Sequence, residues 1–167
     1  MKRILAVVIV VLSLVGCKSK PTVDVSVNGP FNLDSFLGEW FEIARYDYSY
    51  EKNMDKSKAI YSVRRDGTIE FVNTGLIKGE PKYAKGAIKL TEVPRHLRIS
   101  FFGPFYGDYL IFYLDDDYTY ALVGSSSDKY LWLLSRAPQL DEERTQILLE
   151  EARRRGFDTD KLVWVVQ

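Results

Sequence analysis

The side chains best able to support catalysis are few in this chain of 167 residues, which has one histidine, His96, and one cysteine, Cys17. A serine hydrolase needs a serine, a histidine and a carboxylate placed together. The serines nearest to a suitable turn are Ser125–Ser127, directly after Gly124. The run Gly-Ser-Ser-Ser-Asp lacks the second glycine of a nucleophile elbow, and no strand-to-helix pattern follows it. We therefore interpret this segment as a polar hairpin loop.

Metal and cofactor chemistry have equally little support in the sequence. The three carboxylates Asp115–Asp117 have neither the spacing nor the glycine of a calcium-binding EF-hand loop, and one histidine with one cysteine cannot form a four-ligand zinc site. The sequence also contains no glycine-rich phosphate loop and no dinucleotide-binding fingerprint. It therefore predicts no catalytic residue, no metal and no cofactor, and we expect a protein that is not an enzyme.

The lone cysteine follows a segment that is typical of exported proteins. Lys2 and Arg3 give a short positive start, and residues 4–15 are an apolar run broken only by Ser13. The run is too short to cross a bilayer, which needs about 20 residues, but it has the length of a signal-peptide core. The alternative is a buried N-terminal helix or strand, with Cys17 as a free thiol.

Residues 14–17, Leu-Val-Gly-Cys, resemble the lipobox of bacterial lipoproteins. The resemblance implies that a signal peptide of residues 1–16 is removed and that acyl chains such as palmitate on Cys17 anchor the protein in a membrane. Each buried methylene contributes about 0.8 kcal/mol, and a single acyl chain gives only reversible binding, so stable attachment needs more than one acyl chain. Lys18 stands where an aspartate would imply retention in the inner membrane. We therefore expect the outer membrane, on its periplasmic face.

Composition separates a short tether from one folded domain. Residues 17–30 are polar and rich in turn-forming residues, whereas every aromatic residue lies from Phe31 onward. The 23 Lys and Arg residues balance 23 Asp and Glu residues, which leaves no excess positive charge for nucleic acid. We assign residues 17–30 to the lipidated cysteine and its tether, and residues 31–167 to a single domain.

The domain consists mainly of segments in which apolar and polar residues alternate, separated by turns about every 8–12 residues. This pattern predicts an all-β fold in which eight antiparallel strands close on themselves and leave no exposed edge. The pair Asp66-Gly67 is typical of a tight hairpin between the second and third strands. The predicted strands are Trp40–Tyr46, Lys58–Arg64, Thr68–Asn73, Tyr83–Leu90, Leu97–Phe102, Asp108–Leu114, Tyr118–Val123 and Tyr130–Ser135.

One segment breaks this alternation. Residues 141–155 contain no glycine or proline, begin with the capping residue Asp141, and place Leu148 and Ala152 on one helical face. We therefore predict one C-terminal α-helix. Residues 161–166, KLVWVV, then predict a short final strand.

The start of the first strand, Gly38-Glu39-Trp40, resembles the first conserved motif of the lipocalin family. It continues as GEWFEIARYD, which is similar to the bacterial lipocalins of the outer membrane and to their animal relative apolipoprotein D. YLIFYLDDDYTYALV, residues 109–123, resembles the second conserved region and puts Asp116 at the family's acidic turn position. YLWLLSRAP, residues 130–138, resembles the third region, which ends its strand with an arginine, here Arg136.

The resemblance implies an eight-stranded antiparallel up-and-down barrel with one C-terminal α-helix and a short final strand. It also implies a barrel closed at one end, with an internal apolar pocket for a small lipophilic molecule. In this family Trp40 and Arg136 would meet at the closed end, the guanidinium over the indole, in a contact worth about 0.5–2 kcal/mol. We therefore expect Gly38, Trp40, Asp116 and Arg136 to be structural rather than ligand-binding.

Side chains alternate across a strand, so the motif alignment also predicts which residues face inward. In the first strand these are Trp40, Glu42 and Ala44, and Glu42 is the only carboxylate of the inward set. Small inward residues such as Gly86 are expected to leave room for a ligand where a filled barrel would need bulk. The residues predicted to contact the ligand are Ala59, Tyr61, Phe71, Asn73, Ala84, Gly86, Ile88, Leu97, Ile99, Leu110, Phe112, Tyr120, Tyr130 and Trp132.

These features favour a membrane-anchored lipocalin that binds, transports or stores fatty acids, lysophospholipids or similar lipids in the cell envelope. The expected partners are that small lipophilic ligand and the membrane, without nucleic acid, and a homodimer stays open. Two alternatives also stay open. One is an enzyme of the same fold that acts on a lipid in the pocket, and the other is a filled barrel that serves as an envelope interaction protein.

Overall fold

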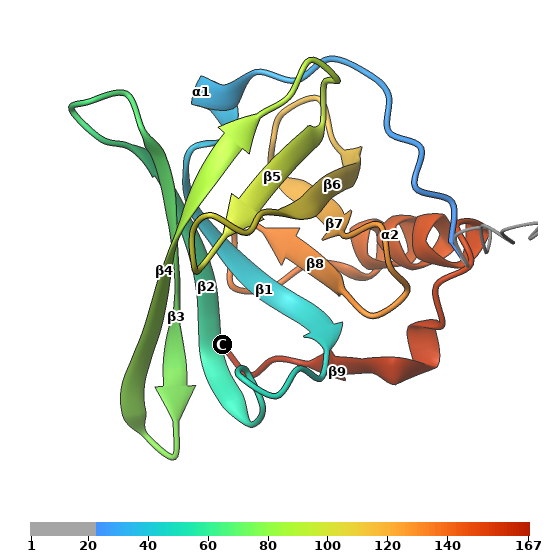
Figure 1. Ribbon diagram of the computed structural model, residues 1–167. Helices are drawn as coiled ribbons and strands as arrows, with labels where there is room; N and C mark the ends of the chain where they lie inside the picture. The colour runs from blue at the N-terminus through green and yellow to red at the C-terminus, as the bar shows by residue number, and fades with distance from the viewer. Residues whose placement is uncertain (1–22) are drawn as a thin grey trace, which may run out of the picture.

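In the computed structural model, which describes residues 23–167, nine strands form one sheet that curls into a barrel (Figure 1). The strands pair in the order β2-β3-β4-β5-β6-β7-β8-β1-β9, and β1 also pairs with β2, which closes the first eight strands into a ring. The predicted eight-stranded antiparallel barrel is confirmed. The strands are β1 (Gly38–Tyr46), β2 (Met54–Val63), β3 (Ile69–Ile77), β4 (Glu80–Leu90), β5 (His96–Ser100), β6 (Gly107–Leu114), β7 (Tyr120–Gly124), β8 (Leu131–Ser135) and β9 (Leu162–Trp164).

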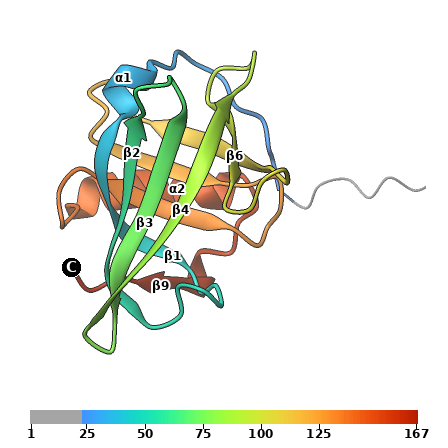
Figure 2. The same ribbon diagram turned by 60° about the vertical axis from the view of Figure 1, so that its left-hand side comes forward.

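Local sequence explains how β2 pairs with β3. Gly67 has a φ of +83°, which glycine adopts without steric cost, and Asp66 Oδ1 accepts a hydrogen bond from the backbone N–H of Thr68 at 2.9 Å. The predicted hairpin is therefore present, and its register places Tyr61 opposite Phe71. Figure 2 shows β2, β3 and β4 running side by side along the barrel.

A short helix, α1 (Leu33–Phe36), which the sequence did not predict, closes one end of the barrel. The indole Nε1 of Trp40 donates a hydrogen bond to the carbonyl oxygen of Phe36 at 2.8 Å. The guanidinium of Arg136 lies 4.0 Å from the centre of the Trp40 ring and donates to carbonyl oxygens of α1 and of the start of β1. The structure thus contains the contact between Trp40 and Arg136 that the family resemblance implies, and Arg136 also ties α1 to β1.

The other two predicted motif residues differ in what they do. Gly38 has a φ of +95°, and a Cβ atom there would lie 3.3 Å from Arg136 Nη1, so glycine suits this position. Asp116 is exposed, and the turn between β6 and β7 is held by Asp115 instead. The Asp115 carboxylate accepts hydrogen bonds from two backbone N–H groups and from the Thr119 hydroxyl at 2.6–2.8 Å. The assignment of the acidic turn position to Asp116 is therefore corrected to Asp115, because only that carboxylate reaches back across the turn.

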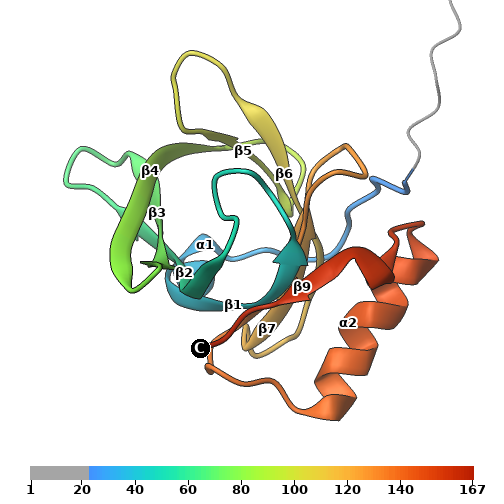
Figure 3. The same cartoon turned by 90° about the horizontal axis from the view of Figure 1, so that it is seen from below.

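The helix α2 (Glu142–Arg154) covers the outer face of β6 and β7, and Figure 3 shows it outside the ring of strands. The side chain of Asp141 accepts a hydrogen bond from the backbone N–H of Arg144 at 2.8 Å, which caps the helix. The predicted helix is confirmed to within one residue at each end. The residues that it buries are Leu148, Leu149 and Ala152.

The C-terminal segment completes the wall of the barrel. After the 3-10 turn η1 (Thr159–Lys161), β9 pairs with β1, which confirms the short final strand. The backbone N–H of Val165 donates to the carbonyl oxygen of Ile43 at 3.0 Å, and that of Lys56 donates to the carbonyl oxygen of Val166 at 2.7 Å. The tail therefore bridges β1 and β2 where these two strands no longer pair directly.

Residues 23–30, the described part of the predicted tether, lie along the domain. The guanidinium of Arg155 donates to the carbonyl oxygens of Asp24 and Ser26 at 3.1 and 2.6 Å. These residues are therefore packed on the domain beside the end of α2 and do not form a free tether. The predicted signal peptide and Cys17 lie outside the described residues. Within the part of the chain that the structure describes, no helix is long and apolar enough to cross a membrane.

Candidate ligand-binding site

The barrel encloses a small central cavity. Its volume is about 20 Å³, which is room for about one water molecule. Six of the predicted contact residues line it, namely Ala59, Tyr61, Phe71, Asn73, Ile99 and Trp132. The other lining residues are Glu42, which was predicted to face inward, and Tyr50, Phe101, Tyr109 and Leu134.

Aromatic side chains fill most of the barrel interior. The hydroxyl groups of Tyr61 and Tyr109 are hydrogen-bonded at 2.6 Å, and the ring of Phe71 lies 4.8 Å from that of Phe101. A Cβ atom on Gly86 would lie 2.3 Å from the Phe71 ring, so this ring takes up the space that glycine leaves. The expectation that Gly86 leaves room for a ligand is therefore wrong, because a neighbouring side chain fills the room.

Three predicted contact residues lie on the outer face of the barrel instead. Tyr109 lines the central cavity, so Leu110, the next residue of β6, faces the opposite side. The Phe112 ring packs against Arg155 at the end of α2, and the Tyr120 ring lies 5.7 Å from an arginine of the same helix. These predictions fail because α2 covers β6 and β7 from outside. Both faces of the two strands are then apolar, and alternation no longer distinguishes the inner one.

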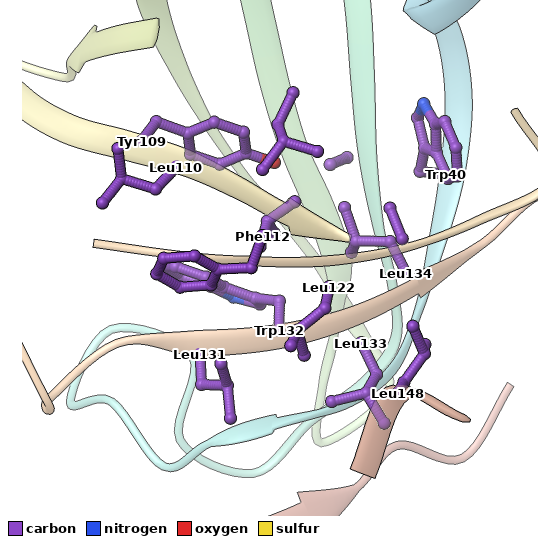
Figure 4. Close-up of a cluster of buried hydrophobic side chains, with 14 of the residues drawn as sticks. Trp40, Tyr109, Leu110, Phe112, Leu122, Leu131, Trp132, Leu133, Leu134 and Leu148 are labelled. Carbon is purple, nitrogen blue, oxygen red and sulfur yellow. The ribbon is translucent and has the colours of Figure 1, made fainter. Parts of the chain in front are cut away.

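The strand β8 follows the predicted alternation. Figure 4 shows Trp132 and Leu134 on one side of its ribbon and Leu131 and Leu133 on the other. Trp132 and Leu134 line the central cavity, which identifies their side as the inner one. Five further predicted contact residues do not line this cavity, although they are not on the α2 side. These are Ala84, Gly86, Ile88, Leu97 and Tyr130.

A larger pocket opens at the end of the barrel opposite to α1, between the β5–β6 and β7–β8 connections; we call it the mouth pocket. Its volume is about 530 Å³, within the range of about 300–1,000 Å³ that small-molecule sites occupy. Of the predicted contact residues it is lined by Ile99, Tyr130 and Trp132. Phe101, which the alternation of its strand predicts to face inward, also lines it. The lining residues that sequence reasoning missed are Tyr50, Ser100, Phe102, Phe105, Gly107, Asp108, Tyr109 and Ser125–Ser127.

The connection between β1 and β2 lies across this end of the barrel, as Figure 3 shows. The Tyr48 hydroxyl donates to the carbonyl oxygen of Leu131 at 3.0 Å and accepts from its backbone N–H at 2.7 Å. The Tyr48 ring lies 4.9 Å from that of Trp132, and the Tyr50 ring lies 5.9 Å from that of Phe101. This connection therefore supplies part of the aromatic wall between the central cavity and the mouth pocket.

A buried ion cluster, made of Glu42, Arg45 and Glu51, lies beside the central cavity. A β-bulge between Glu42 and Ala44 shifts the alternation of β1, so Arg45 and not Ala44 faces inward. Arg45 Nη1 lies 3.6 Å from Glu42 Oε2, and Arg45 Nε lies 3.4 Å from Glu51 Oε2. The predicted inward position of Ala44 is corrected accordingly, because the extra residue Ile43 changes which side chains point inward.

Glu51 is the best-satisfied acid of this cluster. Its carboxylate accepts hydrogen bonds from Asn73 Nδ2 at 3.1 Å and from Trp132 Nε1 at 3.4 Å. Arg45 Nη2 donates to the carbonyl oxygens of Glu51 and Met54 at 2.7 and 3.0 Å. The cluster therefore fixes the β1–β2 connection inside the barrel.

Glu42 is held mainly as a neutral acid. Burial, and then repulsion by Glu51, raise the pKa of Glu42 from 4.5 to about 8, although Arg45 acts in the opposite direction. Its Oε2 has no hydrogen-bond partner among residues 23–167. Burial also raises the pKa of Glu51, against the effects of Arg45 and of the hydrogen bonds from Trp132 and Asn73.

His96, Asp108 and Ser126 do come together, but in an order unsuited to hydrolysis. Asp108 Oδ1 accepts from His96 Nε2 at 2.9 Å, and Asp108 Oδ2 accepts from Ser126 Oγ at 2.7 Å. The serine hydroxyl thus bonds to the carboxylate and not to the imidazole that would have to take its proton. Within the described part of the chain, no group of three or more His, Cys, Asp or Glu residues could hold a metal ion.

Comparison with known proteins agrees with this architecture. The chain matches the Lipocalin-like domain family over residues 31–167. It is 42% identical to the outer membrane lipoprotein Blc of Citrobacter freundii, over 99% of this chain and 98% of that protein. It is 41% identical to the protein of the same name from Vibrio cholerae, over 91% of both chains. Apolipoprotein D of Mus musculus is a more distant relative at 31% identity, over 87% of this chain and 79% of that protein.

Solved structures share the fold at much lower identity. Lobster apocrustacyanin A1 aligns with a TM-score of 0.67 and 21% identity, over 81% of this chain and 79% of that one. Insecticyanin from the tobacco hornworm Manduca sexta aligns with a TM-score of 0.66 and 18% identity, over 82% and 81% of the two chains. At this identity the similarity shows the fold alone.

Proposed function

Since this chain belongs to the lipocalin family, we propose that it binds a small lipophilic molecule in the mouth pocket. The observation that carries the proposal is the pocket itself, about 530 Å³ of space at the open end of a closed barrel, in which half of the lining residues are aromatic. Lining of this kind favours an apolar ligand with few polar groups. The central cavity, at about 20 Å³, is too small for such a ligand, so the interior below acts as a packed support.

The apolar part of the lining suits the single acyl chain of a fatty acid or a lysophospholipid. Burial of about 10–14 methylenes, at about 0.8 kcal/mol each, gives a gross gain of about 8–11 kcal/mol. Association and ordering of the chain offset several kcal/mol of this gain, so we expect a dissociation constant of about micromolar. Affinity should rise with chain length until the mouth pocket is filled and should then level off.

The proposed location is the outer membrane, with the domain on the periplasmic face. Support comes from the lipobox-like residues that end at Cys17 and from the relatives in Citrobacter freundii and Vibrio cholerae, which are named as outer membrane lipoproteins. A lipid-anchored binding protein would meet its ligand at the membrane to which it is attached. The role that follows is storage or transfer of single-chain lipids in the envelope.

A binding role suits the geometry better than catalysis. The Ser126 hydroxyl is bonded to the Asp108 carboxylate and not to His96. Among residues 23–167, the ion pair of Glu42 is with Arg45. The alternative of a filled barrel describes the central part of the interior but not the mouth pocket.

Tryptophan fluorescence tests the proposal directly, because Trp132 lines both the central cavity and the mouth pocket. Fatty acids and lysophospholipids of about 8 to 18 carbons would be titrated into the mature protein. The expected result is a saturable change that Trp132→Phe removes. The matched control is Trp164→Phe, since Trp164 lies in β9 and is 53% exposed. A signal that no chain length changes would overturn the proposal.

A further inference from the structure

The lining of the mouth pocket offers few groups that could bind an anionic head group. Among the described residues that line it, none is lysine or arginine, and Asp108 is the one charged residue. A carboxylate or phosphate group usually binds to arginine, lysine or a cluster of N–H donors. The aromatic residues that line the pocket are Tyr50, Phe101, Phe102, Phe105, Tyr109, Tyr130 and Trp132.

Asp108 is ionised at neutral pH. The hydrogen bond from Ser126, and then that from His96, hold the pKa of Asp108 below its ordinary value, against the effect of burial. Its side chain is 30% exposed and lines the mouth pocket, so its charge can act on a ligand there. Asp108 thus places a carboxylate at this edge of the pocket, with His96 and Arg98 of the neighbouring strand β5 beside it.

The cation beside the central cavity, Arg45, is already paired with acidic side chains. Arg45 lies between the carboxyl groups of Glu42 and Glu51, at 3.6 and 3.4 Å. Its Nη2 already donates to two backbone carbonyl oxygens. An anionic head group that moved inward would therefore meet Glu51 as well as Arg45.

Two phenylalanine rings at the outer rim are largely exposed, whereas two tyrosine rings there are partly covered because each stacks against Tyr48. The side chains of Phe102 and Phe105 are 83% and 81% exposed, and those of Tyr50 and Tyr130 are 44% and 40% exposed. The faces of aromatic rings attract cations, and groups of rings are used to bind quaternary ammonium ions. The rim thus combines several ring faces with a single negative charge.

We propose that the mouth pocket selects amphiphiles whose polar end carries an ammonium group, such as a choline-type head, over amphiphiles whose polar end is only anionic. The acyl chain packs on the apolar lining, and the ammonium group lies against the ring faces of the rim beside Asp108. The inference rests on the proposed lipid-binding function and names the class of lipid that this site prefers.

The test compares three probes with the same myristoyl chain, lysophosphatidylcholine, lysophosphatidylglycerol and monomyristoylglycerol, bound to the mature protein. A single cation–π contact predicts that the choline lipid binds about fivefold more tightly than the glycerol phospholipid, or more. Phe102→Leu with Phe105→Leu keeps the lining apolar but removes two ring faces, and should reduce this ratio. The matched control is Tyr83→Leu, which changes a 74% exposed aromatic residue outside the pocket.

The charge is tested separately by Asp108→Asn. The control for it is Asp128→Asn, which removes the same charge from an exposed position in the β7–β8 connection outside the mouth pocket. Asp108→Asn should lower the preference for the choline lipid, and Asp128→Asn should not. If Asp108→Asn fails to fold, the inference is still tested by the affinity ratio of the choline lipid to the glycerol phospholipid, measured in the wild-type protein and in the double phenylalanine variant.

The possible results separate the head-group preference from lipid binding itself. A preference that falls in the pocket variants and persists in both controls supports the inference. Equal affinity for the two phospholipids, or a preference that neither pocket variant reduces, overturns it while leaving lipid binding intact. If monomyristoylglycerol and both phospholipids all fail to bind, the proposed function is wrong, and the inference is wrong with it.

Discussion

Replacing Glu42 by glutamine should stabilise the protein, and the gain should grow as the pH rises. The pKa of Glu42 is raised from 4.5 to about 8 in the folded protein, so the folded state holds a proton that the unfolded chain releases. Between these two values each pH unit costs the wild-type protein about 1.4 kcal/mol of unfolding free energy through this group. Glutamine has the same shape and no proton to lose. The difference between variant and wild type should therefore increase by about 2–3 kcal/mol from pH 5 to pH 7.

Urea unfolding of both proteins at several pH values between 5 and 9 measures this difference. All other titrating groups are shared, so their effects cancel in the comparison. Glu39→Gln is the matched control, because Glu39 lies in the same strand but is exposed and pairs with Lys58. A stability difference for Glu42→Gln that stays constant over this range would refute the reasoning, since it would mean that Glu42 is ionised in the folded protein.

Three further predictions concern the anchor, the closed end and the packed interior. Cys17→Ser should leave the domain folded but move it from the membrane to the soluble fraction, and a variant that still sediments with membranes after a high-salt wash would contradict the lipid anchor. Trp40→Ala should lower the unfolding free energy by about 3–5 kcal/mol, because it empties a fully buried site at the closed end. Ligand affinity per folded molecule should stay nearly unchanged, and a loss of affinity without a loss of stability would place Trp40 at the ligand site instead. Phe71→Ala should enlarge the central cavity and shift the preferred acyl chain to a greater length in the fluorescence titration. An unchanged chain-length profile would mean that the enlarged central cavity does not join the mouth pocket.

The barrel could be predicted because its evidence is local and repeated. Alternating strands, the Asp66-Gly67 turn and the N-terminal cap of α2 each depend on a few neighbouring residues, and the structure bears out all three. The inner face was predictable where the outer face of a strand meets water or where the motif alignment fixed the parity, as with Tyr61 and Phe71 in β2 and β3 and Trp132 in β8. The prediction of inward-facing side chains failed in β6 and β7, because α2 covers their outer faces and these are therefore apolar as well.

The ion cluster depends on features that a sequence pattern does not contain. Nothing in Glu42-Ile43-Ala44-Arg45 signals a bulge, yet the bulge is what turns Arg45 inward. Glu51 lies in a connection between strands, where a charged residue is ordinarily expected in water. Its burial depends on partners far along the chain, such as Trp132.

The mouth pocket was missed for a related reason. Most of its walls belong to connections, and alternation predicts side-chain direction only within strands. The segment 100–107 turns away from β5 and exposes Phe102 and Phe105 at the rim. The clustering of aromatic residues in these connections was the one available signal.

The central claim, that the mouth pocket holds a single-chain lipid, is tested most directly by the mass of the native protein. The Cys17→Ser form would be purified from cells without detergent and examined by native mass spectrometry, followed by extraction and identification of any released lipid. The account predicts a species heavier than the bare chain by one single-chain lipid. It also predicts that excess lysophosphatidylcholine displaces this lipid. A bare chain alone, with no lipid in the extract and no complex formed with added lysophosphatidylcholine, would contradict it.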